Sequence, residues 1–177
     1  RTLLPIDAKY LELSYPATTG TQPALTVAGD VLTQGADGGY GSWVFVAANQ
    51  LAITSPGSAP PTFHVSVPAS QIDALGAQTL VIGGNGDSAG GGASTPLGLP
   101  AAGNSVVMQN GAILSASQVF VVSNQITLEP GSGIDTLNAP AIPAGLTQDV
   151  TYGQDSPALI AVSNGRLTLA GANGSGS

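Results

Sequence analysis

The stretch VFVVSNQITLEPGSG, residues 119–133, has a near copy earlier in the chain. The earlier copy is VFVAANQLAITSPG at residues 44–57, and a looser one, IAVSNGRLTLAG, occupies residues 160–171. Each copy contains a short alternating apolar stretch, an asparagine, a second alternating stretch and a closing Gly or Pro-Gly. Asparagine tolerates the left-handed backbone that bends a chain sharply. The order strand, corner, strand, turn is typical of a chain that coils on itself.

The spacing of the copies indicates that one structural unit recurs. Val44 aligns with Val119, 75 residues later, and the third copy follows the second after about half that distance. A weaker member, TFHVSVPASQIDALGAQTLVIGG, occupies residues 62–84. These distances fit coils of roughly 20 residues with insertions. We therefore predict an all-β fold, a parallel β-helix (β-solenoid).

In such a coil, alternate side chains of every strand point into a narrow axial core, and the backbone pairs with coils about 4.8 Å above and below. The side chains predicted to face inward are Val44, Val46, Leu51, Ile53, Phe63, Val65, Val67, Leu80, Ile82, Val106, Met108, Ile113, Val119, Val121, Ile126, Leu128, Ile134, Leu159, Leu167 and Leu169.

The whole chain, residues 1–177, is interpreted as a single solenoid segment with irregular insertions. Three stretches lack strand periodicity or are interrupted by proline and glycine, near residues 15–24, 85–104 and 138–157. We expect them to leave the coil as loops, where binding residues commonly lie. Short strands with regular turns also suit an antiparallel β-sandwich, which remains the alternative.

The composition agrees with a chain of strands and turns. Only 7% of the residues are charged, against roughly 25% in a typical soluble domain. Exposed amphipathic helices normally carry many charged residues, so few helices are expected. The 25 glycines and 13 prolines supply the many tight turns that short strands need.

Charge and cysteine content restrict the partners and the chemistry. The net charge is −7, and the only cations are Arg1, Lys9 and Arg166. This charge disfavours nucleic acid and anionic membrane surfaces as partners, and we expect no membrane insertion. There is no cysteine, so thiolate chemistry and most zinc sites are excluded. The sequence contains no apolar run long enough for a membrane span and no signal-peptide pattern at its start. Because it begins without Met, we expect a segment of a longer protein.

No catalytic or metal-binding pattern emerges. His64 is the single histidine, and Ser66 two residues later lacks the turn of a nucleophile elbow. Glycoside hydrolysis would require two carboxylates close together. The sequence offers only two modest clusters of acids, Asp30 with Asp37 and Asp149 with Asp155. We expect no enzymatic activity, no cofactor and no metal.

Aromatic and amide side chains mark two further features. Tyr40 and Trp43 in GGYGSW stand at a predicted turn, where exposed rings would serve as a surface contact for a sugar or a protein. Burial of Trp43 against a neighbouring coil is the alternative. Asn49, Asn124 and Asn164 occupy the corner of each copy, and we predict that they stack as a hydrogen-bonded ladder.

Three phrases carry a family resemblance. LGAQTLVIGG (residues 75–84), GAILSASQVFVVSNQITLEPGSGI (residues 111–134) and NGRLTLAG (residues 164–171) resemble the rod of filamentous-haemagglutinin-like exoproteins. These large bacterial adhesins leave the cell by two-partner secretion, and L-x-I-G-G phrases followed by strand-Asn-strand coils recur along their right-handed β-helical shaft. The resemblance covers residues 24–171 and implies that the predicted β-helix is right-handed. The Asn-Pro-Asn-Leu motif of the family's secretion domain is not found, so no functional residue is carried over.

The resemblance implies a structural or adhesive segment of a large secreted or cell-surface bacterial exoprotein, acting in adhesion, in biofilm or as a filament scaffold. The implied partners are a host-cell or bacterial surface receptor or glycan, and neighbouring copies or shaft segments end to end. The implied location is extracellular, on the bacterial cell surface. A polysaccharide-binding or polysaccharide-cleaving β-helix protein, such as a lyase or a phage tail fibre, is the alternative.

Overall fold

The described residues are mostly β-strand with almost no helix, as the sequence predicts. The computed structural model describes residues 10–15, 29, 31, 39, 41–59, 61–62, 65–83, 97–98, 105–152 and 158–171. Within these ranges there are fourteen strands and one short helix, α1 (Ala69–Asp73). The strands are β1 (Tyr10–Tyr15), β2 (Trp43–Ala48), β3 (Gln50–Thr54), β4 (Val65–Pro68), β5 (Thr79–Ile82), β6 (Leu97–Gly98), β7 (Ser105–Met108), β8 (Ile113–Ser115), β9 (Gln118–Ser123), β10 (Ile126–Leu128), β11 (Gly133–Asp135), β12 (Thr147–Tyr152), β13 (Ala158–Ser163) and β14 (Arg166–Gly171).

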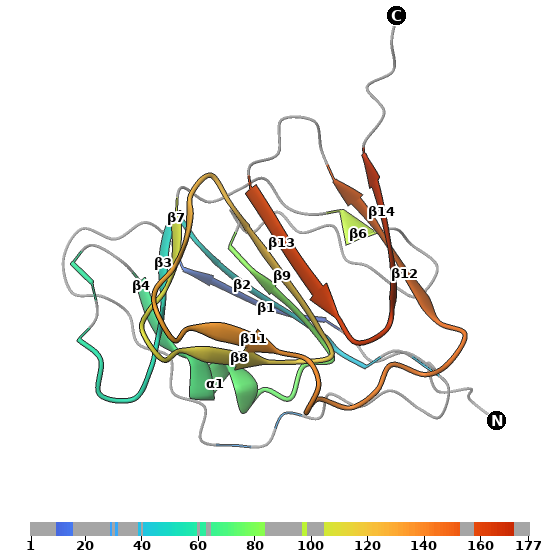
Figure 1. The fold of residues 1–177 in the computed structure, drawn as a ribbon, viewed down its shortest axis with the longest axis horizontal. Coiled ribbons are helices and arrows are strands. Elements are labelled where there is room, and N and C mark those ends of the chain that lie inside the picture. The colour runs from blue at the N-terminus through green and yellow to red at the C-terminus, as the bar shows by residue number, and fades with distance from the viewer. Residues whose placement is uncertain are drawn as a thin grey trace, which may run out of the picture.

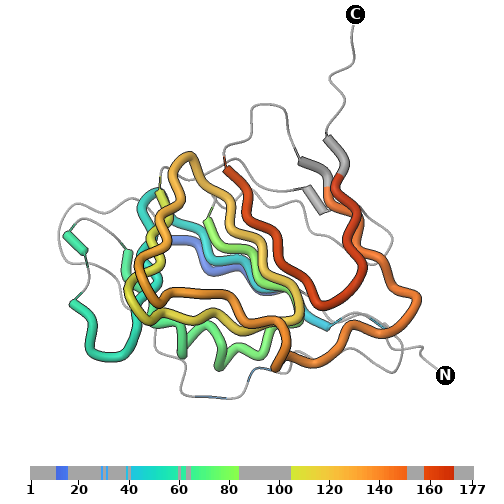
Figure 2. Tube along the Cα trace, viewed as in Figure 1, coloured from blue at the N-terminus to red at the C-terminus, as the bar shows by residue number. Residues whose placement is uncertain are grey.

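Four sheets organise these strands. The five-stranded sheet has the order β1-β2-β5-β9-β13, the four-stranded sheet β10-β7-β3-β4, the two-stranded sheet β11-β8 and the three-stranded sheet β14-β12-β6. The first three sheets form the sides of a triangle, with α1 beside β8, and the three-stranded sheet lies outside the triangle (Figure 1; Figure 2). Nine of the ten strand pairings among the described residues are parallel, which does not fit an antiparallel sandwich.

The two closest sequence copies occupy equivalent places in this triangle. Val44 in β2 and Val119 in β9 both pair with Leu80 of β5, which lies between them. The second strands of these copies, β3 and β10, flank β7 in the same way. The predicted spacing of about 20 residues is found where Ile126 pairs with Val106 and Gly133 pairs with Ile113.

The sheets are nevertheless mixed and irregular. Strand β4 lies on the far side of β3 instead of between β3 and β7, so the order of strands in this sheet does not follow the chain. The third sequence copy does not repeat the arrangement, because β13 runs antiparallel to β9 and β14 belongs to the three-stranded sheet. Strand β12 falls inside the loop predicted near 138–157, and helix α1 falls inside the weak copy at 62–84. The predicted insertions at 15–24 and 85–104 lie almost wholly outside the described residues.

Two apolar clusters fill the molecule. The main core lies inside the triangle and includes the inward-facing residues of β2, β3, β4, β5, β7 and β9 together with those of α1. A smaller outer cluster lies on the opposite face of the five-stranded sheet, where Phe45 and Phe120 pack with Val150 of β12. The central strands β2, β5 and β9 of the five-stranded sheet are therefore buried on both faces, which accounts for the unbroken apolar runs of β2 and β9.

Most side chains predicted to face inward do so, with instructive exceptions. Ile113 is 43% exposed, because the turn before it directs its neighbours Ala112 and Leu114 into the core. Leu169 is 53% exposed because β14 is not part of the triangle. Leu159 and Leu167 pack against the outer cluster instead of the main core, and Phe63 lies outside the described residues.

One column of turns stacks along an edge of the triangle. The turns at 55–58, 109–112 and 129–132 each close with a backbone hydrogen bond from the fourth residue to the first. The third position of each turn has a positive φ, as in a type II turn, and carries glycine. These glycines are Gly57 (φ 83°), Gly111 (φ 73°) and Gly131 (φ 75°). Hydrogen bonds from the Ser55 hydroxyl to the Asn110 carbonyl (2.8 Å) and from the Asn110 N–H to the Glu129 carboxylate (2.9 Å) join the three turns.

The last residue of α1 gives a first testable expectation. Burial raises the pKa of the Asp73 carboxyl, although the Ser115 N–H, which donates to it over 2.9 Å, opposes the shift. A raised folded-state pKa means that the ionised carboxyl destabilises the fold once the pH has risen through that pKa, and that this effect vanishes well below pH 3.8. Asp73→Asn keeps an acceptor for Ser115 and should raise stability at neutral pH by about 0.5 kcal/mol, a small value because solvent screens a half-buried group. Urea denaturation should show the gain at neutral pH and none in acid; an equal gain at both would contradict the role of the charge.

Candidate functional site

The predicted surface contact is wrong for Trp43 and is not described for Tyr40. Trp43 begins β2 and is only 3% exposed. Its ring stacks on Phe45, with centroids 6.3 Å apart and an angle of 29° between the ring planes. Both rings belong to the outer cluster beneath the three-stranded sheet, so Trp43 has a structural role. Tyr40 lies outside the described residues.

A buried polar row crosses the five-stranded sheet at the same register as Trp43. Thr79 pairs with Gln118, which pairs with Ser163 of β13. The Thr79 hydroxyl donates to Gln118 Oε1 (3.0 Å), and Gln118 Nε2 donates to the Ser163 hydroxyl (3.1 Å). These bonds satisfy polar groups that would otherwise destabilise a dry interior. The row has no charged member. Its side-chain hydrogen bonds link neighbouring strands and so fix the register of β5, β9 and β13.

The predicted asparagine ladder does not form. Asn124 follows the last residue of β9, whereas Asn164 follows the last residue of β13, which pairs with the first residue of β9. The antiparallel direction of β13 therefore places the two asparagines at opposite ends of the sheet. The Asn164 side-chain amide instead donates to the carbonyls of Thr136 (2.9 Å) and Pro140 (3.2 Å), which anchors the segment before β12.

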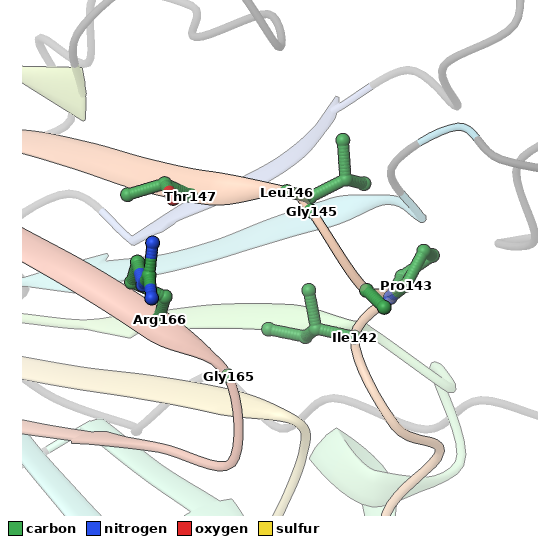
Figure 3. A pocket seen from close by; sticks show the side chains of 8 residues that line it. Ile142, Pro143, Gly145, Leu146, Thr147, Gly165 and Arg166 are labelled. Carbon is green, nitrogen blue, oxygen red and sulfur yellow. The ribbon is translucent and has the colours of Figure 1, made fainter.

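A cleft next to this anchor is the best candidate for a binding site among the described residues. We call it the Arg166 cleft; it has a volume of about 290 Å³. The side chains around it come from the start of β14, the start of β12 and the segment before β12 (Figure 3). Its lining residues are Ile142, Pro143, Ala144, Gly145, Leu146, Thr147, Gly165 and Arg166.

Local backbone chemistry builds the two walls of the Arg166 cleft. One wall is a turn closed by a hydrogen bond from the Leu146 N–H to the Pro143 carbonyl (3.2 Å). The other wall begins where β14 pairs with β12, which sets Arg166 opposite Thr147. The walls meet at Gly165, because a Cβ atom there would lie 2.9 Å from the Cβ of Ile142. The corner between β13 and β14 therefore depends on a residue without a side chain.

This contact supports a second prediction. Gly165→Ala should destabilise the chain by about 1–3 kcal/mol, because the methyl group overlaps a branched side chain on a neighbouring segment. The double substitution Gly165→Ala with Ile142→Gly removes all three Ile142 atoms that the new methyl group would meet, so its loss should be clearly smaller than the sum of the two single losses. Thermal unfolding followed by circular dichroism measures both. Additive losses in the double variant would show that Gly165 is required for another reason.

The Arg166 cleft offers groups suited to binding an anion. The Arg166 guanidinium has several N–H donors in a planar fork that suits a carboxylate or a phosphate. Apolar side chains surround it, and its lining residues include no carboxylate, histidine or serine that would act as a general base or nucleophile. Across the described residues no group of three His, Cys, Asp or Glu side chains lies close enough to hold a metal ion.

The other residues considered from sequence do not extend this site. Asp149 lies exposed on β12, two residues beyond the cleft wall, and its sequence neighbour Asp155 is outside the described residues. His64, Asp30 and Asp37 also lie outside the described residues. No described helix combines the length and apolar character of a membrane span.

Arg166 appeared in the sequence as one of three cations, but its cleft could not be predicted, because the opposite wall comes from a segment interpreted as a loop.

No family model matches the chain, and no curated protein or solved structure is significantly similar to it.

Proposed function

We propose that this chain is a structural or adhesive segment of a large secreted or cell-surface bacterial exoprotein. The proposal includes a finer description of the fold, in which the triangle is a short, irregular right-handed parallel β-helix. The parallel pairing of strands 20 residues apart, from β7 to β10 and from β8 to β11, supports it. Right-handed connection is the strong general preference for parallel strands of one sheet.

The observation that carries the proposal is the stacking of parallel strands and of the turns between them. Side chains that repeat along the chain fill a continuous interior, and the turns stack by hydrogen bonds from one coil to the next. The lining of the Arg166 cleft offers no catalytic pair. The resemblance to filamentous-haemagglutinin-like shafts adds location and role: export by two-partner secretion, the bacterial cell surface, and adhesion or biofilm formation through a receptor or a glycan.

Location gives the direct test of this proposal. Intact cells of the source organism are treated with protease, and the protein is then detected with an antibody to the purified chain. Loss of the signal from intact cells, with a cytoplasmic marker preserved, is the expected result. A protein that stays protected until the cells are lysed would refute a surface role.

Polysaccharide binding or cleavage is the second candidate function, and the Arg166 cleft supports the binding part of it. The Arg166 guanidinium lies beside apolar side chains, and this combination suits a uronic acid, which carries a carboxylate on a ring with an apolar face. Purified chain is incubated with acidic polysaccharides, and both retention and the appearance of shorter products are measured. Arg166→Gln should abolish retention if the cleft binds the acid, and Thr168→Gln, farther along β14, serves as the control.

A further inference from the structure

The triangle has an uncovered end at β10 and β11. Residue Leu128 of β10 pairs with Met108 of β7 and shares its inward direction, yet Leu128 is 48% exposed whereas Met108 is fully buried. Ile126 and Ile134 are likewise only half-buried, whereas the residues they pair with, Val106 of β7 and Leu114 of β8, are buried. These three side chains continue the main core, but the described chain places no further coil over them.

The backbone at this end also has a free side. The Val106 N–H donates to the Gln125 carbonyl (2.8 Å), and the Glu129 N–H donates to the Met108 carbonyl (2.9 Å). In a parallel pair, alternate residues of a strand face the neighbour, so the N–H and C=O groups of Ile126 and Leu128 point away from β7. The bond from the Gly133 N–H to the Ala112 carbonyl (2.9 Å) leaves Ile134 facing away from β8 in the same manner. Free edges of this kind pair readily with another strand.

The described chain does not turn back to cover this end. After β11 it passes to β12 in the outer three-stranded sheet, returns as antiparallel β13 beside β9, and leaves again along β14 in the outer sheet. Strand β13 thus occupies the place on the five-stranded sheet that a next parallel coil would use. The described residues therefore supply no cover for β10 and β11.

We propose that a second copy of this chain covers the end, with the two uncovered ends facing each other around a two-fold axis. A single added strand would pair with β10 or with β11, but it would leave the apolar interior between them open. Another coil end has the matching outline, matching apolar side chains and a free edge of its own. A two-fold contact also closes after two copies, as most homo-oligomers do. This inference is independent of the proposed function, because it concerns only how two chains meet.

Charge sets the conditions under which the contact forms. Glu129 follows β10 and Asp135 ends β11, so like charges approach across the two-fold axis, and each chain carries a net charge of −7. Added salt screens such repulsion between exposed groups. The dimer should therefore strengthen as ionic strength rises, in contrast to a contact held by opposite charges.

Sedimentation velocity over a range of protein and salt concentrations tests the proposal. A monomer–dimer equilibrium is expected, with the dimer favoured by salt. Leu128→Asp should weaken the dimer by at least tenfold, because it places an unpaired charge at the centre of the contact. Leu169→Asp is the matched control, since this side chain is 53% exposed on β14, outside the triangle, and the substitution should change the dimer less than twofold. A monomer at every concentration, a growing series of oligomers, or equal effects of the two substitutions would overturn the proposal.

Hydrogen exchange of the wild-type chain provides a measurement that needs no variant. The amides of Ile126, Leu128 and Ile134 should exchange rapidly in dilute protein and become protected as the dimer forms. The Thr127 amide, which faces β7, is the internal control and should be protected at every concentration. Equal exchange of the three edge amides in dilute and concentrated samples would refute pairing at this edge.

Discussion

Val121→Asp is expected to abolish folding or to lower the free energy of unfolding by at least about 4 kcal/mol. Val121 is fully buried in the main core and pairs with Ile82 on one side and Ile160 on the other. No described cation lies in that cluster to pair with a carboxylate, so the charge would be buried alone. Because natural domains have only about 5–15 kcal/mol of stability in total, this loss removes most or all of it.

Far-UV circular dichroism and urea denaturation measure the effect of Val121→Asp. Thr168→Asp is the control, because Thr168 is exposed on β14 and its substitution should change stability by less than about 0.5 kcal/mol. A soluble Val121→Asp variant with a wild-type spectrum and denaturation midpoint would show that β9 does not face the core as described.

Gly83→Ala is expected to have the second largest effect, a loss of at least about 3 kcal/mol. Gly83 follows β5 and has a φ of 97°, and its N–H donates to the Val46 carbonyl over 2.9 Å. A Cβ atom at this position would lie 2.0 Å from the carbonyl oxygen of Val122. Since that oxygen belongs to the backbone of β9, which is held between β5 and β13, it cannot rotate away as a flexible side chain would.

Gly57→Ala separates this clash from backbone strain alone. Gly57 also has a positive φ, of 83°, but a Cβ atom there meets nothing within 4 Å. The control should therefore lose only about 1 kcal/mol, the usual penalty for an alanine in a left-handed conformation. Equal losses in the two variants, measured by urea denaturation, would mean that the close approach of Gly83 to β9 is not a constraint on the fold.

The strands were predictable because each carries its own alternation of apolar residues. The copies at 44–57 and 119–133 specify β2, β3, β9 and β10 and the turns after β3 and β10. The repeat could not predict the order in which the strands pair within each sheet. The third copy has a similar sequence, yet its two strands lie in different sheets, because the segment from Thr136 to Pro140 holds Asn164 at the other end of β9.

A signal for the second layer was present in the sequence. The strands WVFVAA and QVFVVS are apolar at nearly every position, and a strand needs that pattern only when both of its faces are buried. This pattern would have predicted a cover over the five-stranded sheet, and with it the burial of Trp43. The polar row of Thr79, Gln118 and Ser163 had no such local signal, since only the register between distant strands brings these residues together.

The position of Trp43 has a consequence for any optical study of this chain. It is the single tryptophan, and it lies in the outer cluster rather than in the interior of the triangle. Its emission therefore reports on whether the three-stranded sheet stays in contact with the five-stranded sheet, and says little about the main core. If that sheet detaches first on heating, the fluorescence transition will precede the loss of ellipticity, and two separate midpoints will reveal a partly opened intermediate.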